Sequence, residues 1–351
     1  GNDEDFVSEI VNDASELTYQ PYRLSNPITT YDPKDVFWKD TINNHMWYLK
    51  KTHADQAWDI QRGDEGIVIA VIDTYFDPSH PDLRSEFLMN RNPISDSVYY
   101  PCNSAGTLFS PGHGTLVAGF ASGQTTDENA IQPDTANSCS IGYKTKLLGY
   151  SLIGGGKSML ESALHASTVM KANVITLSAH EGCKPQSPQI EASIINEILE
   201  NGTSIVVAAA NGFCQGCYFN GIENLKVSSC NEPSDFVSFS PTYPFSPDYD
   251  ERIIVVSGTT KGDSLTRRVY DSISQQWHES SFSYFPHVDV CAPGYDLMGI
   301  TPTRIIDTLG QCIYKEWPFY HRNGGTSFST PIVAGLIGLV KSSNPWLNPA
   351  Q

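Results

Sequence analysis

Three polar residues in this sequence have the types and the order of a nucleophilic catalyst: Asp73, His113 and Ser327. A serine hydroxyl is a poor nucleophile at neutral pH unless a base removes its proton as it attacks. A histidine does this best when a buried carboxylate fixes its tautomer and stabilises the imidazolium that forms. The three residues together would support acyl transfer, with Ser327 attacking, His113 moving the proton and Asp73 orienting His113.

The surroundings of two of these residues favour that chemistry. His113 and Ser327 each lie among glycines and small residues, in "PGHGTLVAG" and "NGGTSFSTPIVAG". Small residues let a substrate backbone approach, and a helix start at each place would offer N–H groups to a developing oxyanion. Taken singly, Asp73 is also explained as a strand-end cap, His113 as a structural histidine and Ser327 as an N-cap. Their joint order and context favour catalysis.

The elements that must position these residues alternate between strand and helix. Continuous apolar runs predict five strands, at 66–74, 144–153, 173–179, 203–211 and 252–260, and periodic segments predict helices at 158–172 and 187–202. Such runs are typical of strands buried on both faces. The alternation predicts an α/β fold, doubly wound, with a mostly parallel central sheet and helices on both faces. Because chemistry collects past the carboxyl ends of such strands, we expect Asp73 and Asn211 at the same sheet edge.

Composition and charge narrow the class of protein. The 351 residues carry 22 Lys and Arg against 39 Asp and Glu, for a net charge of −17, which excludes a nucleic-acid partner and favours a monomer. No apolar run approaches about 18 residues, so no membrane span is expected.

Residues 1–30 are polar and acidic and are interpreted as an extension or surface segment. Residues 31–351 are interpreted as one folded domain, either complete or without its last helix.

The chain contains eight cysteines, Cys102, Cys139, Cys183, Cys214, Cys217, Cys230, Cys291 and Cys312. An even number at wide spacing predicts disulfides and an oxidising compartment, although free buried thiols and a zinc site are alternatives. A bridge from Cys183 to Cys214 or Cys217 would brace neighbouring strand ends. Cys291–Cys312 and Cys102–Cys139 are the other two expected pairs.

Three stretches resemble the signatures of the subtilisin-like serine proteases, or subtilases: "DTYFDPSHPDL", "HGTLVAG" and "GTSFSTP". The chain order aspartate, histidine, serine is also the subtilisin order, and the resemblance spans roughly residues 33–351. It implies a secreted serine endopeptidase that cleaves protein or peptide substrates through an acyl-enzyme. It also implies that no organic cofactor is needed and that a cleaved propeptide acts as an inhibitor.

The resemblance assigns roles to individual residues. Ser327 would be the nucleophile, His113 the general base and then acid, and Asp73 the orienting carboxylate. Asn211 resembles the family's oxyanion-hole asparagine, whose side-chain amide acts together with the Ser327 backbone N–H. A second alignment of "AAANG" places Gly212 there instead and removes the side-chain donor.

The substrate-binding residues depart from the family pattern. "VITLSAHEGC" resembles the substrate-binding edge, with Ser178, Ala179 and His180 as its residues, and His180 replaces a glycine. Tyr75, followed by Phe76, stands where the first signature has glycine. We expect these two aromatics to reshape a neighbouring substrate subsite.

The resemblance also makes Ca²⁺ a possible ligand. Asp82 and the segment 124–134 offer the hard oxygen ligands that calcium prefers, although a solvated loop explains the same acids. Two functional alternatives remain beside hydrolysis. One is a maturation protease or transpeptidase that passes the acyl group to an amine, and the other is a protease-like binding protein without turnover.

Overall fold

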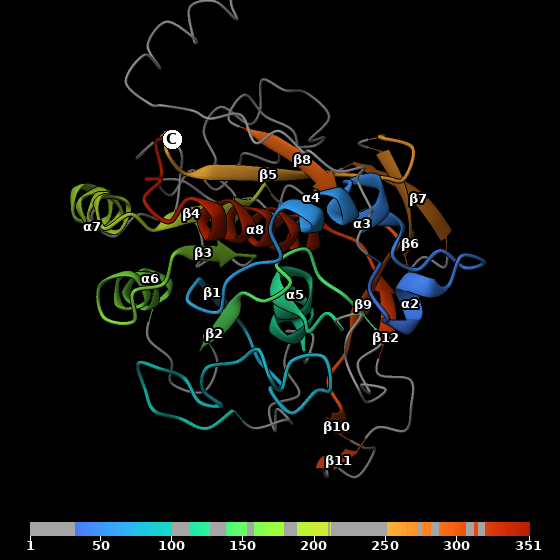
Figure 1. Ribbon diagram of the computed structural model, residues 1–351, viewed down its shortest axis with the longest axis horizontal. Coiled ribbons are helices and arrows are strands. Elements are labelled where there is room, and N and C mark those ends of the chain that lie inside the picture. The colour runs from blue at the N-terminus through green and yellow to red at the C-terminus, as the bar shows by residue number, and fades with distance from the viewer. Residues whose placement is uncertain are drawn as a thin grey trace, which may run out of the picture.

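The computed structural model describes most of the chain from residue 32 onward. The described residues are 32–99, 112–126, 138–152, 158–178, 188–209, 211, 251–264, 266–271, 276–281, 288–306, 312–314 and 320–351. The predicted extension over residues 1–30 lies outside them. The helices are α2 (Val36–Lys39), α3 (Trp47–Lys51), α4 (Ala54–Ile60), α5 (His113–Ser122), α6 (Met159–Thr168), α7 (Pro188–Glu200) and α8 (Thr326–Ser343) (Figure 1).

A parallel sheet of six strands forms the centre, in the order β2-β1-β3-β4-β5-β8. The strands are β1 (Val68–Asp73), β2 (Lys146–Ser151), β3 (Val174–Leu177), β4 (Ser204–Ala208), β5 (Ile254–Thr259) and β8 (Val290–Pro293). The five predicted strands are confirmed, each a little shorter than its apolar run. Sequence patterning misses β8, because two of its four residues are exposed.

Side chains along each strand alternate between two hydrophobic cores. On β1, Ile69 and Val71 belong to the core that includes α5 and α8, whereas Ala70 and Ile72 belong to the core that includes α6 and α7. Burial on both faces explains why the strands read as continuous apolar runs. The predicted doubly wound α/β fold is confirmed (Figure 1).

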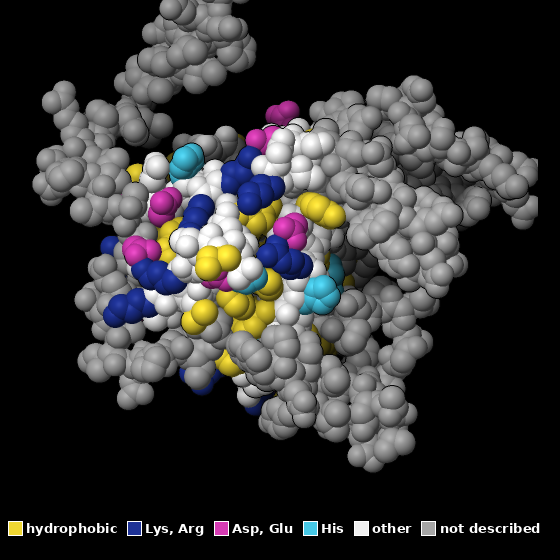
Figure 2. Space-filling model, turned by 90° about the vertical axis from the view of Figure 1, so that its right-hand side faces the viewer, with side chains coloured by type: hydrophobic (Ala, Val, Ile, Leu, Met, Phe, Trp, Pro, Cys, Tyr) yellow, Lys and Arg dark blue, Asp and Glu magenta, His cyan; other side chains and the backbone are white. Residues whose placement is uncertain are grey.

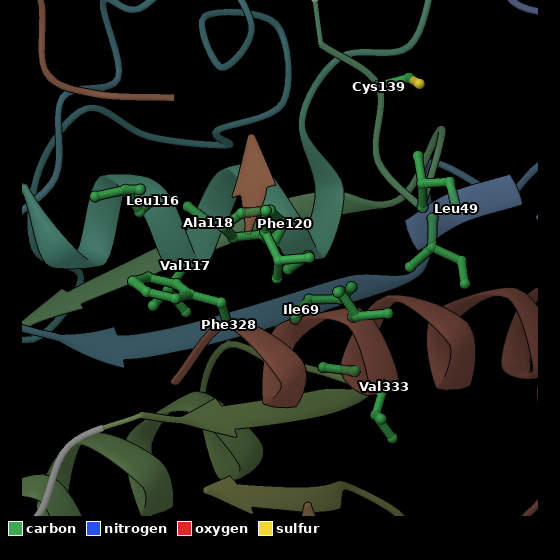
Figure 3. Packing of buried hydrophobic residues seen from close by; sticks show 14 of the residues in the cluster. Leu49, Ile69, Leu116, Val117, Ala118, Phe120, Cys139, Phe328 and Val333 are labelled. Carbon is green, nitrogen blue, oxygen red and sulfur yellow. The ribbon is translucent and has the colours of Figure 1, made fainter. Parts of the chain in front are cut away.

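Helices α5 and α8 pack closely against each other over the sheet. A Cβ on Gly335 of α8 would lie only 2.5 Å from the Ala121 carbonyl oxygen of α5, so glycine permits this approach. Nearer the start of α8, Phe328 reaches toward α5, and its ring centroid lies 5.5 Å from that of Phe120 (Figure 3). The contact sets the position of the first turn of α8 relative to α5.

Smaller elements surround this body. Three antiparallel pairs lie at its edges, formed by β6 (Thr266–Asp271) with β7 (Gln276–Ser281), β9 (Leu297–Ile300) with β12 (Tyr320–Asn323), and β10 (Arg304–Ile306) with β11 (Cys312–Tyr314).

On the face shown in Figure 2, basic and acidic side chains are interspersed. Ion pairs such as Lys51–Asp263, at 2.7 Å, join segments that are far apart in the sequence. Among the described helices, none combines the length and apolarity that a membrane crossing requires.

Two cysteines correct the predicted disulfide pattern. Cys139 is buried and Cys291 is exposed, and both are free. The expected pairs with Cys102 and Cys312 are therefore wrong. Cys139 packs inside the hydrophobic core, where burial, with the charges of nearby carboxylates, raises the pKa of its thiol. The expected bridge of Cys183 lies outside the described residues.

Candidate active site

Asp73 is the last residue of β1, at the point of the sheet where the strand order reverses between β1 and β3. Its side chain is fully buried. Thr74 donates two hydrogen bonds to its Oδ1, from the backbone N–H at 2.6 Å and from the hydroxyl at 3.1 Å. These bonds hold the carboxylate where the strand ends.

His113 is the first residue of α5, as the sequence predicts. Gly112 precedes it as the N-cap with φ of +109°, a conformation that favours glycine. The Nδ1 atom of His113 lies 2.9 Å from both carboxylate oxygens of Asp73. Since the carboxylate can only accept there, Nδ1 carries the proton, and the lone pair of neutral His113 is on Nε2.

The electrostatics of His113 follow from this contact. Burial alone would lower the pKa of His113, but the charge of Asp73 and the hydrogen bond to it outweigh burial and raise that pKa above its ordinary value. Its side chain still keeps about a quarter of its surface exposed, at 23%. His113 therefore combines an oriented imidazole with access from solvent.

Ser327 is the second residue of α8 and does not cap the helix, because the N-cap is Gly325. Its hydroxyl donates a long hydrogen bond of 3.4 Å to the Ser178 carbonyl oxygen, while the Ser178 hydroxyl donates one of 2.8 Å to the Ser327 carbonyl oxygen. Ser178 directly follows β3. Among the described residues, the Ser327 backbone N–H has no acceptor, as expected for the first turn of a helix.

Asn211 lies beside the start of α8. Its Oδ1 accepts the Thr326 backbone N–H at 2.8 Å, so the amide nitrogen is directed away from that bond. A Cβ on Gly325 would lie 3.3 Å from Oδ1 and 3.4 Å from Nδ2, so glycine leaves room for the amide. The contact with Thr326 favours the alignment that uses Asn211 over the one that uses Gly212. Sequence reasoning missed Thr326, because nothing in its local pattern identifies a partner that is 115 residues away in the chain.

The described contacts thus form two polar pairs, one of Asp73 with His113 and one of Ser327 with Ser178. The ring centroid of Phe328, the residue after Ser327, lies 5.5 Å from that of His113. This ring contact places the start of α8 beside the start of α5.

The predicted substrate-binding residues have different outcomes. Phe76 is completely buried and packs against the rings of Phe87 and Tyr99, so the expectation that it reshapes a substrate subsite stays a prediction. Tyr75 is also largely buried, at 8% exposure. Ala179 and His180 lie outside the described residues.

The described residues hold no group of three or more His, Cys, Asp or Glu side chains that could bind a metal. Asp82 is fully buried, and its carbonyl oxygen accepts the Gln124 backbone N–H at 2.6 Å. Most of the segment 124–134 lies outside the described residues. Calcium therefore stays a prediction, which the change in melting temperature on chelation by EGTA would test.

The comparisons with known proteins agree with the fold. The chain matches the subtilase family over residues 64–351 and belongs to that family of serine proteases. It is 28% identical to the thermophilic serine proteinase of Bacillus sp. strain AK1 over 348 residues, which covers 97% of this chain and 67% of the relative. It is 27% identical to thermitase of Thermoactinomyces vulgaris over 320 residues, which covers 89% of this chain and 86% of thermitase.

Solved structures show the same fold. A protease from Pseudoalteromonas arctica matches with a TM-score of 0.58 at 21% identity, covering 91% of this chain and 89% of the other. MycP1 with its N-terminal propeptide removed matches with a TM-score of 0.56 at 23% identity, covering 87% and 86%. At these identities the likeness concerns the fold, and the roles of individual residues depend on the geometry of this chain.

Proposed function

We propose that this subtilase is a serine endopeptidase in which Ser327, His113 and Asp73 cleave peptide bonds through an acyl-enzyme. The Ser327 oxygen attacks the carbonyl carbon while its proton passes to His113 Nε2. As the C–N bond breaks, His113 gives this proton to the departing amine. Water then attacks the acyl-enzyme, His113 takes its proton, and the Ser327 oxygen recovers a proton as the acid product leaves.

Two donors would stabilise the oxyanion of each tetrahedral intermediate. One is the Ser327 backbone N–H in the first turn of α8, and the other is the Asn211 side-chain amide. The bond from Thr326 to Asn211 orients the amide before substrate binds, so little reorganisation is needed during the reaction. The positive end of the helix dipole at the start of α8 adds to this stabilisation.

The observation that best supports the proposal is the double contact of His113 Nδ1 with both oxygens of buried Asp73, at 2.9 Å each. This contact fixes the tautomer that a general base needs. We further propose a monomeric enzyme that acts outside the cytoplasm and is made with a cleaved propeptide. Both extracellular and intracellular proteases occur among its relatives.

Intact mass after incubation with a fluorophosphonate tests the proposal. Wild type should gain one adduct, and Ser327→Ala should gain none. Ser329→Ala is the matched control on the same helix, because Ser329 is buried and its hydroxyl donates to the Pro293 carbonyl oxygen. A folded wild type without an adduct would contradict the proposal and favour a binding protein. Product masses with a peptide and an added amine distinguish hydrolysis from transpeptidation.

A further inference from the structure

A second buried carboxylate, Asp77, lies in the loop after Asp73 and takes no part in the steps above. It is 1% exposed. Its Oδ1 accepts the Ser79 backbone N–H at 3.1 Å and the Ser79 hydroxyl. Its Oδ2 accepts the Thr303 backbone N–H at 2.7 Å and the Thr303 hydroxyl at 2.6 Å. Four neutral donors therefore surround Asp77, and the described residues give it no cationic partner.

These bonds join the two segments that lie on either side of the start of α5. On one side, a Cβ on Gly114 would lie 2.6 Å from the Tyr75 carbonyl oxygen and 3.1 Å from Asp73 Cβ. On the other side, a Cβ on Gly112 would collide with the ring of Pro302. The residue between these glycines is His113, so the loop after β1 and the turn at Pro302 enclose its backbone.

Asp77 connects both sides and also reaches α5. Thr303, which its carboxylate binds, directly follows Pro302. The Asp77 backbone N–H donates to the Thr115 hydroxyl at 3.0 Å, and Thr115 is two residues after His113. One residue thus links the loop that follows Asp73, the helix that carries His113 and the turn that packs against Gly112.

We propose that Asp77 is a positioning residue that holds the start of α5 against the end of β1 and so keeps His113 in contact with Asp73. The proposal rests on the proposed function, because it assigns a role in general-base catalysis. Release of the turn at Thr303 would let the start of α5 move away from β1. A displacement of about 1 Å in a catalytic group is enough to cost about 100-fold in rate.

The shape of the carboxylate explains why an amide cannot replace it. Each oxygen of Asp77 accepts from one backbone N–H and one hydroxyl. In Asp77→Asn, the NH₂ group would face one of these pairs of donors and accept from neither. The variant keeps the volume of the side chain and breaks one of its two connections.

Asp35 provides a matched control elsewhere in the molecule. It is also 1% exposed, and its carboxylate accepts the Thr126 backbone N–H at 3.0 Å and the Thr126 hydroxyl at 3.1 Å. The described side-chain bonds of Asp35 connect the segment beside α2 to Thr126 and do not reach the start of α5. Asp35→Asn should lower the melting temperature and leave turnover per folded molecule unchanged.

The experiment measures kcat and KM on a peptide anilide and, by NMR, the pKa of His113, with His113→Gln used to assign the signal. Among the described residues, Asp73 is the one charged group that acts on His113. Loss of that contact should therefore lower the pKa of His113. We expect Asp77→Asn to lower kcat about 100-fold with little change in KM and to lower this pKa.

Thr303 variants keep the test decisive if Asp77→Asn does not fold. Thr303→Val removes one hydroxyl donor and should lower kcat about 10-fold, and Thr303→Ser should restore it. An unchanged His113 pKa in a folded variant, with activity lost only in proportion to melting temperature, would overturn the proposal. An inactive wild type would instead defeat the proposed function, while the NMR comparison would still test the role of Asp77.

Discussion

The two halves of the candidate site are built differently. The half formed by Asp73 and His113 contains a buried charge, and short hydrogen bonds fix both of its side chains. The half formed by Ser327 and Asn211 is neutral, and its bonds run mainly between side chains and the backbone. The one hydrogen bond donated by the Ser327 hydroxyl is long, at 3.4 Å.

This difference suggests a division of labour. A buried carboxylate is costly unless it is well bonded, so the charged half must be organised before substrate arrives. The neutral half needs donors that are aimed at a charge which exists only during the reaction. The long bond of the Ser327 hydroxyl suits a group that must change partners, because little is lost when it is exchanged for His113. Four substitutions test this comparison.

Removal of the nucleophile should have the largest effect. Ser327→Ala should lower kcat by about 10⁶, a magnitude taken from the corresponding loss in subtilisin. Substrate affinity and melting temperature should change little, because the hydroxyl makes only one long bond. Steady-state hydrolysis of a peptide anilide and calorimetry measure the two quantities. Retention of more than about 1% of the wild-type rate would show that another group attacks.

Removal of the buried charge should have the next largest effect. Asp73→Asn should lower kcat by about 10⁴, because an amide no longer selects the tautomer with its lone pair on Nε2. In wild type, activity should fall as pH drops through the pKa of His113, which Asp73 raises above about 6.5. Without the charge, burial dominates and this acidic limb should move to lower pH. The pH dependence of kcat/KM measures the shift, and an unmoved limb would contradict the contact.

Loss of one oxyanion donor should cost less. Asn211→Ala should lower kcat about 100- to 1000-fold, with little change in KM. Asn211→Asp is the matched control, because it keeps an oxygen for the Thr326 N–H but has no amide donor. If the donor matters, both variants lose activity. If Asn211 only anchors the start of α8, the aspartate variant should stay near the wild-type rate, and the oxyanion role would be refuted.

The two halves also differ in how far the sequence predicts them. Asp73 is predictable because it ends a strand that reads as a continuous apolar run. His113 is predictable because it begins a helix of small residues. The contacts of Asn211 are not predictable from the sequence. Asn211 lies beyond the end of β4, and its bond to Thr326 depends on how distant elements pack. The two disulfide predictions that involve Cys139 and Cys291 failed for a similar reason. Wide spacing of cysteines says nothing about whether a thiol such as Cys139 is enclosed by the core.

The smallest expected effect concerns the bond that joins Ser178 to the nucleophile. Ser178→Ala removes the 2.8 Å hydrogen bond to the Ser327 carbonyl oxygen, worth about 1 kcal/mol, and should lower kcat about fivefold. Ser162→Ala in α6 is the control, because Ser162 is also buried but its hydroxyl has no partner among the described residues. A lower kcat at constant KM would mean that Ser178 acts through Ser327. A raised KM at constant kcat would place Ser178 in substrate binding instead, as the resemblance of its segment to the family's substrate-binding edge predicts.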